Sequence, residues 1–201
     1  MIAIIDYGVG NLFSVEKAFA QFTDDVQVTS DQAAIEQAEK LVLPGVGEFG
    51  ACMKNLVASG LIPTIMKRIS AGVPLLGICV GLQVLFDGSE ESPDAKGLGV
   101  FRGMVRKINA PGLKVPHMGW NSVEVSQPGL GLFKDIPETP YFYFVHSYHA
   151  VPEDSSIVAA VTEYGEGLTA AVARDNVMAT QFHPEKSGDV GLLVIKNFIN
   201  S

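Results

Sequence analysis

The chain has 201 residues, of which 47% are hydrophobic, so it can bury a sizeable core and intrinsic disorder is excluded. Its 14 Lys and Arg face 22 Asp and Glu, and a net charge of −8 without a basic cluster argues against a nucleic-acid or membrane partner. Two cysteines are too few for a disulfide framework and fit a reducing cytosol, so we expect a cytoplasmic protein.

Short apolar runs alternate with helical periodicity through the first half of the chain. The predicted strands are Ile2–Asp6, Val26–Thr29, Lys40–Gly45 and Val73–Ile78. The predicted helices are 12–22 with Asn11 as N-cap, 31–38, 52–58, 62–71 and 79–86. Continuously apolar strands separated by helices predict βαβ units and a largely parallel central sheet flanked by helices.

The second half changes character. From Lys96 to Ala179 the chain is rich in Gly, Pro and short alternating runs, which predict additional antiparallel strands. A last helix is expected over Asp189–Asn200. Because no repeat and no linker interrupts the pattern, we expect one α/β domain over residues 1–201.

The segment "GICVG" places Cys79 between Gly77 and Gly81, after a predicted strand and before a predicted helix. This is the sulfur analogue of the Gly-x-Ser-x-Gly nucleophile elbow, a strained turn that leaves room only for small neighbours. A helix N-terminus also favours a thiolate. Taken alone, the turn is also compatible with a buried structural cysteine, which is how we interpret Cys52.

A cysteine nucleophile needs a base and a group that orients the base. His183 and Glu185 end an apolar strand in "QFHPEKS", and residues i and i+2 of a strand share a face. The loop Pro44–Gly47 has little side-chain bulk and could present backbone N–H groups to a developing oxyanion. Together these segments predict a Cys79–His183–Glu185 triad.

Other motifs are weaker. The segment Tyr7–Phe13 has two glycines of a dinucleotide fingerprint but Phe13 in the third position, so nucleotide binding is rejected. His146 and His149 lack further ligands at metal-binding spacing. We therefore expect neither a cofactor nor a metal.

The segments "GICVGLQ", "QFHPEKS" and "LPGVGEFG" resemble those of class I (triad) glutamine amidotransferases, and the resemblance spans nearly the whole chain. It implies that family's α/β fold, with Cys79 as nucleophile, His183 as base and acid, and Glu185 as the orienting carboxylate. It also implies an oxyanion hole formed by Gly45, Val46 and Val80.

Within this family, "PHMGWN", "YFVHSYHA" and Lys186 resemble the glutaminase subunits of imidazole glycerol phosphate synthase, from histidine biosynthesis. The resemblance implies L-glutamine as substrate and a heterodimer with a (β/α)₈-barrel cyclase subunit. The residues implied near the glutamine are Gln83, Glu91, His146, Ser147 and Tyr148. Those implied at the partner face are Asn11, Met118, Trp120, Asn121, Tyr143 and Lys186.

Two alternatives stay open at this point. The chain could serve another amidotransferase, such as anthranilate or aminodeoxychorismate synthase, although "PHMGWN" and "HPEKS" argue against that. It could also be a non-catalytic α/β interaction domain in which Cys79 is structural.

Overall fold

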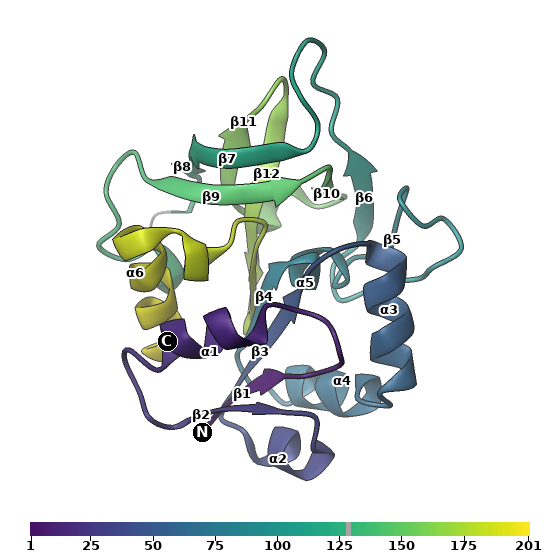
Figure 1. The fold of residues 1–201 in the computed structure, drawn as a ribbon, viewed down its shortest axis with the longest axis vertical. Coiled ribbons are helices and arrows are strands. Elements are labelled where there is room, and N and C mark those ends of the chain that lie inside the picture. The colour runs from purple at the N-terminus through teal and green to yellow at the C-terminus, as the bar shows by residue number, and fades with distance from the viewer. Residues whose placement is uncertain (128–129) are drawn as a thin grey trace.

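A twisted eight-stranded sheet forms the centre of the computed structural model, which describes residues 1–127 and 130–201 (Figure 1). The strand order is β2-β1-β3-β4-β13-β12-β11-β8. Their bounds are β1 Ile2–Ile5, β2 Val26–Thr29, β3 Lys40–Gly45, β4 Leu75–Cys79, β8 Glu124–Val125, β11 Val158–Glu163, β12 Gly167–Arg174 and β13 Val177–Thr180. The first five strands of this order pair in parallel and the last three in antiparallel fashion, which confirms the predicted fold class.

Helices cover the parallel part of the sheet. They are α1 Leu12–Phe19, α2 Gln32–Gln37, α3 Phe49–Ala58, α4 Ile62–Ser70, α5 Val80–Gln83 and α6 Gly188–Ile199. α1 packs on α6, where the rings of Phe19 and Phe198 meet edge to face at 6.3 Å, and α2 packs on α4. Because crossover connections are right-handed, the α1–α6 pair and the α2–α4 pair lie on opposite faces.

Two smaller sheets stand beyond the carboxyl ends of the parallel strands (Figure 1). One contains β5 Gly88–Ser89, β6 Gly103–Lys107 and β10 Tyr148–Pro152, and the other pairs β7 His117–Ser122 with β9 Tyr141–His146. The remaining short turns are η1 Gly131–Phe133, η2 Ser155–Ile157 and η3 Pro184–Lys186. A cavity lies where these small sheets meet the main sheet.

The predicted strands Val26–Thr29 and Lys40–Gly45 have the observed bounds, but the helix predicted over 12–22 was wrong in detail. α1 ends at Phe19, so Phe22 lies outside it and is 38% exposed. Asn11 occupies the N-cap position but its side chain makes no capping hydrogen bond. Helical periodicity alone therefore extended this helix too far.

Two further helix bounds depend on contacts between distant segments. α3 begins at Phe49, three residues before the predicted start, because Glu91 accepts the Phe49 N–H at 2.9 Å and Ser92 accepts the Gly50 N–H at 3.1 Å. The helix predicted over 79–86 is shorter and covers only Val80–Gln83. Among the described residues no single helix is long and apolar enough to cross a bilayer; α3 and α4 meet that test only as a pair bent by 93°.

Candidate active site

The turn between β4 and α5 is the strained elbow that the glycine spacing predicts. Cys79 has φ +56° and ψ −112°, a backbone conformation that side chains rarely adopt. A Cβ on Gly77 would lie 2.8 Å from the Gly81 carbonyl oxygen, and one on Gly81 would lie 1.9 Å from the Leu43 carbonyl oxygen. Both glycines are therefore required by close backbone contacts around the cysteine.

His183 and Glu185 lie together behind Cys79. The Nδ1 of His183 is 2.8 Å from the Glu185 Oε1, and the two side chains are only 2% and 1% exposed. The predicted reason was wrong, since β13 ends at Thr180 and Glu185 lies in the turn η3. That turn, rather than strand alternation, brings the carboxylate back to the ring.

The electrostatic environment favours a charged imidazole. Burial lowers the pKa of His183, but interaction with Cys79 and with Glu185 outweighs it and raises the pKa to about 9. The ring's other nitrogen, Nε2, is buried and makes no hydrogen bond within residues 1–127 and 130–201. A protonated His183 beside Cys79 can stabilise a thiolate and later donate a proton to a leaving group.

This pKa leads to a prediction for Glu185→Gln. In the wild type, the charged His183 imidazole also contributes to the free energy of unfolding. This contribution is fully present below the unfolded-state pKa of about 6.5 and is lost as the pH rises through about 9. Removing the carboxylate charge lowers the His183 pKa, so the alkaline limb of kcat/KM should move to lower pH, with a loss of roughly 10²- to 10⁴-fold in rate. Glutaminase rates between pH 6 and 10 test this. An unchanged limb, or an equal shift in the exposed control Glu138→Gln, would contradict it.

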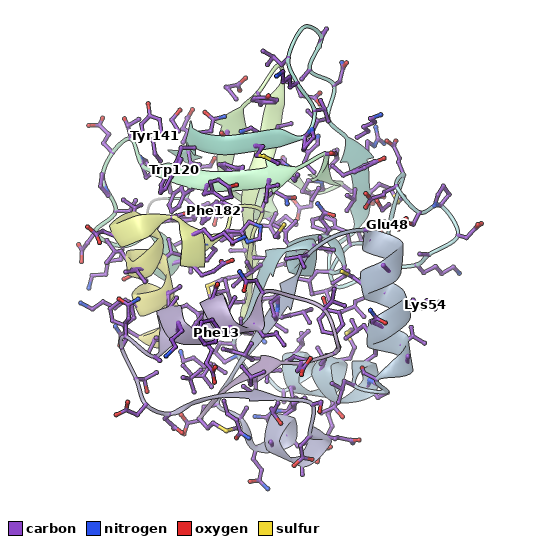
Figure 2. All side chains as sticks on the ribbon, in the orientation of Figure 1. Phe13, Glu48, Lys54, Trp120, Tyr141 and Phe182 are labelled. Carbon is purple, nitrogen blue, oxygen red and sulfur yellow. The ribbon has the colours of Figure 1, made fainter. Side chains whose placement is uncertain are left out.

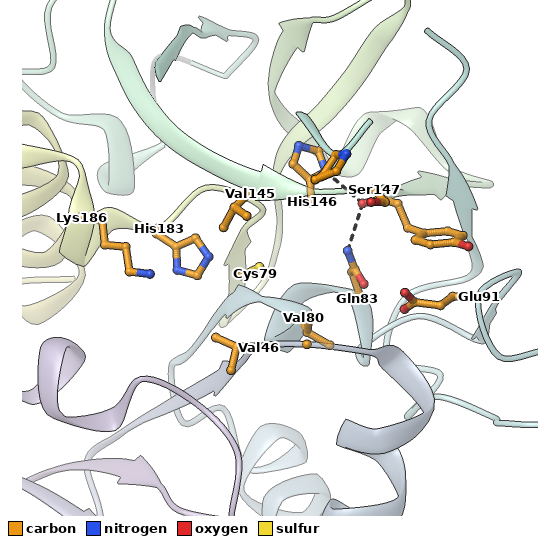
Figure 3. Close-up of a pocket in the computed structure, with 13 residues that line it drawn as sticks. Val46, Cys79, Val80, Gln83, Glu91, Val145, His146, Ser147, His183 and Lys186 are labelled. Atoms are coloured by element: carbon orange, nitrogen blue, oxygen red, sulfur yellow. Dashed lines mark hydrogen bonds between the residues drawn. The ribbon is translucent and has the colours of Figure 1, made fainter. Parts of the chain in front are cut away.

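A cavity of about 360 Å³ opens in front of the cysteine (Figure 3). Its lining residues are Val46, Gly47, Cys79, Val80, Gln83, Glu91, Pro116, Val145, His146, Ser147, Tyr148, His183 and Lys186. All five residues expected near glutamine are among them. Figure 3 shows His183 and Lys186 at one end of the cavity and Gln83 and Glu91 at the other. The cysteine can therefore reach a ligand that enters between these ends.

The three expected oxyanion residues differ in position. Val46 and Val80 line the cavity, whereas Gly45 does not. Gly45 pairs with Cys79 in the β3–β4 register, and a Cβ there would lie 2.7 Å from the Gly81 nitrogen. Gly45 thus allows the loop to approach the elbow. In the described part of the chain the Val46 N–H donates no hydrogen bond, so it is free to bind an anionic oxygen.

Gln181 was not predicted from the sequence. It contacts two residues that line the cavity, Gln83 and Cys79. Its Oε1 accepts a hydrogen bond from Gln83 Nε2 at 3.1 Å, and its Nε2 lies 3.8 Å from the Cys79 Sγ. Gln83 Nε2 also donates to the Tyr148 carbonyl at 3.0 Å. The sequence signal was only a polar residue directly after an apolar strand, whereas its complete burial and its hydrogen bonds are visible in the structure alone. Gly47, Pro116 and Val145 also line the cavity without having been predicted.

Two buried histidines connect the cavity with β7. His146 Nδ1 donates to the Tyr148 carbonyl at 2.9 Å, so its Nε2 accepts from His117 Nδ1 at 2.9 Å, and His117 Nε2 in turn accepts from Asn121 Nδ2 at 3.2 Å. Burial lowers the pKa of His117 to about 4 and that of His146 to about 3. Both rings are therefore neutral, as this pattern requires.

Of the expected partner residues, Lys186 lines the cavity and Met118 pairs with Val145, which also lines it. Met118 and Trp120 are 62% and 56% exposed on β7, where Figure 2 labels Trp120. The Trp120 ring lies edge to face with that of Tyr143, with 6.4 Å between the ring centres. Lys186 is exposed in η3, which contacts α1, the helix that follows Asn11. Asn121 differs, because its amide is directed inward and also donates to the Glu163 carbonyl at 2.9 Å.

Three comparisons place the chain among known proteins. Residues 3–200 match the family model for class-I glutamine amidotransferases. The chain is 51% identical to imidazole glycerol phosphate synthase subunit HisH of Syntrophotalea carbinolica, over 98% of both chains. It is 52% identical to the subunit of that name from Methanothermobacter thermautotrophicus, over 99% of this chain and 98% of the relative.

Solved structures share the fold at lower identity. A crystal structure of a glutamine amidotransferase covers all of this chain and 98% of its own, with a TM-score of 0.78 and 22% identity. The structure of PurLQS from Thermotoga maritima covers 99% of this chain and 97% of its own, with a TM-score of 0.78 and 19% identity. At these identities the likeness is evidence for the fold alone.

Proposed function

The chain belongs to the class-I glutamine amidotransferase family, and on this premise we propose that it is the glutamine-hydrolysing subunit of an imidazole glycerol phosphate synthase. The observation that carries the proposal is the buried His183–Glu185 pair behind Cys79, at an elbow that opens into the cavity. The names of the relatives, which are about half identical over nearly their whole length, supply the choice of synthase.

The reaction begins when the Cys79 thiolate attacks the side-chain carboxamide carbon of glutamine. The oxygen of the tetrahedral intermediate becomes negative and is bound by the N–H groups of Val46 and Val80. His183 gives its proton to the departing nitrogen, and ammonia leaves a γ-glutamyl thioester. His183 then removes a proton from water, which attacks the thioester and releases glutamate and the thiol.

The amino-acid end of glutamine is recognised at the end of the cavity that lies away from His183 and Lys186. Glu91 holds the start of α3 through one carboxylate oxygen, Oε2, and still presents negative charge suited to an α-ammonium group. Ser147 and Tyr148 line the same cavity and offer a hydroxyl and backbone groups to the α-carboxylate. Hydrogen bonds from His146 Nδ1 and Gln83 Nε2 hold the Tyr148 carbonyl in place.

Ammonia released in the cavity needs an acceptor, which we assign to a cyclase subunit with a (β/α)₈ barrel in a cytoplasmic heterodimer. That subunit would use ammonia to make imidazole glycerol phosphate and the purine precursor AICAR. The proposed docking face comprises Met118 and Trp120 of β7, Tyr143 of β9, Lys186 beside the cavity, and Asn11. Exposed aromatic side chains at the centre of a surface are typical of interface hot spots.

The test is glutamine hydrolysis by the chain alone, with the cyclase subunit, and with the cyclase subunit plus its nucleotide ligand. We expect weak activity alone and strong stimulation by the loaded partner, because docking of the partner can complete the orientation of the oxyanion donors that the Pro44–Gly47 loop carries. Trp120→Ala should weaken partner affinity by roughly 30-fold in calorimetry, the effect of a typical hot spot. Val57→Ala, equally exposed but on α3, is the matched control. Equal turnover in all three mixtures would contradict the proposed coupling.

A further inference from the structure

The oxyanion loop, Pro44–Gly47, is held from behind by two buried side chains that the reaction does not use. The Tyr7 hydroxyl donates to the Pro44 carbonyl at 2.7 Å, and the Cys52 thiol lies 3.3 Å from the Val46 carbonyl as a donor. Tyr7 is 5% exposed and Cys52 is fully buried. Neither residue lines the cavity, so both act on the loop from its protein side.

The two contacts fix alternate peptide groups of the loop. Because a trans peptide is planar, the direction of a carbonyl sets the opposite direction of the N–H in the same plane. The Tyr7 bond therefore sets the orientation of the Gly45 N–H, and the Cys52 bond sets that of the Gly47 N–H. The Val46 N–H lies in the peptide between these two, and its position is determined by both.

The close packing of Tyr7 against the loop and the protonation states of Tyr7 and Cys52 both support this orientation of the loop peptides. A Cβ on Gly45 would lie only 3.0 Å from the Tyr7 hydroxyl oxygen, so the phenol touches the loop where it passes the elbow. Burial raises the pKa of the Tyr7 phenol and that of the Cys52 thiol. Both groups therefore keep the proton that they donate.

We propose that Tyr7 and Cys52 are positioning residues for glutamine hydrolysis, which clamp the peptides on either side of the Val46 N–H and so aim it at the developing oxyanion. The inference rests on the proposed glutaminase function. It concerns the transition state, because the oxyanion exists only after Cys79 attacks, and the clamp does not contact the part of the cavity that holds the amino-acid end of the substrate.

The experiment compares Tyr7→Phe and Cys52→Ala with the wild type in the presence of the loaded partner. Each variant should lower kcat by roughly 10- to 100-fold, below the cost of losing an oxyanion donor outright, while KM changes less than about twofold. Cys52→Ser restores a donor and should recover most of the rate. Leu56→Val, one turn further along α3 and equally buried, is the control for general loosening of that helix.

A second measurement distinguishes a misoriented oxyanion loop from other causes of a lower kcat. Glutamate γ-semialdehyde forms a reversible thiohemiacetal when the Cys79 sulfur bonds to the aldehyde carbon and the oxygen takes the charge or the thiol proton. Its inhibition constant should rise in each variant by about the factor by which kcat falls, while the dissociation constant of glutamate stays the same. A loss of kcat without this rise, or equal losses in Leu56→Val, would overturn the proposal.

The orientation of the loop peptides can also be measured without following the reaction. In ¹H–¹⁵N spectra of the whole chain, Tyr7→Phe should shift the Gly45 amide resonance and Cys52→Ala that of Gly47, each more than amide resonances of residues that do not contact the substituted side chain. Unmoved resonances would contradict the clamp even if the wild type proved unable to hydrolyse glutamine. An inactive wild type with shifted resonances would contradict only the proposed function.

Discussion

Replacing Cys79 with alanine is expected to lower glutamine hydrolysis by roughly 10⁴- to 10⁶-fold, while glutamine still binds. The thioester intermediate requires the sulfur, and neither His183 nor the oxyanion loop can replace a missing nucleophile. The fold should persist, because alanine keeps the Cβ at this elbow. The measurement is glutamate production with the loaded partner, together with calorimetric binding of glutamine and a thermal unfolding curve.

Cys52 provides a control within the same chain. A chloroketone analogue of glutamine should alkylate Cys79 and add one label to the protein mass, and Cys79→Ala should remain unlabelled. Cys52 should stay unlabelled in both, because it is fully buried, does not line the cavity and has a thiol pKa raised by burial. Activity above about 1% in Cys79→Ala, or labelling of Cys52 instead, would contradict the assigned nucleophile.

Most of the sheet was predictable from the sequence because its buried parallel strands are continuous apolar runs. β3 has the predicted bounds for this reason, whereas β2 is a partly exposed edge strand, Val-Gln-Val-Thr, whose predicted bounds also agree with the structure. Helix ends were harder, because they depend on partners far along the chain. The start of α3 is set by Glu91 and Ser92, about 40 residues away, and no local pattern encodes that contact.

In the candidate site, too, residues marked by a local sequence pattern were predictable, and residues that depend on tertiary contacts were not. Cys79 and its glycines could be identified because the elbow imposes a local spacing, and the resemblance to the family supplied the other cavity residues. Gln181 and Tyr7 could not be placed, since each acts through a hydrogen bond to a group far along the chain. Cys52 is buried as expected, but its contact with the Val46 carbonyl was not predicted. The pairing of His183 with Glu185 was predicted from a strand, but a short turn produces it. The two side chains do pair, but for a geometric reason other than the predicted one.

The second large effect is expected for Gly81→Ala, which should lower the free energy of unfolding by about 3 kcal/mol and reduce glutaminase activity at the same time. An added Cβ would lie 1.9 Å from the Leu43 carbonyl oxygen and 3.0 Å from its carbon, where side-chain rotation offers no relief. β3 and α5 must therefore separate. Since β3 leads into the oxyanion loop and α5 follows Cys79, the separation moves the nucleophile and the oxyanion donors apart.

Urea unfolding and kcat measured on one preparation test this, with Gly131→Ala as the matched control because a Cβ there meets no atom within 4 Å. The control should change stability by no more than about 0.5 kcal/mol. Equal stabilities would show that the elbow is less tightly packed than these contacts require. Gly81, unlike Gly47, does not have a positive φ, so its replacement fails through contact and not through backbone strain. The defect should therefore be relieved only where β3 can move, and any variant that restores stability by that movement should still lack full activity.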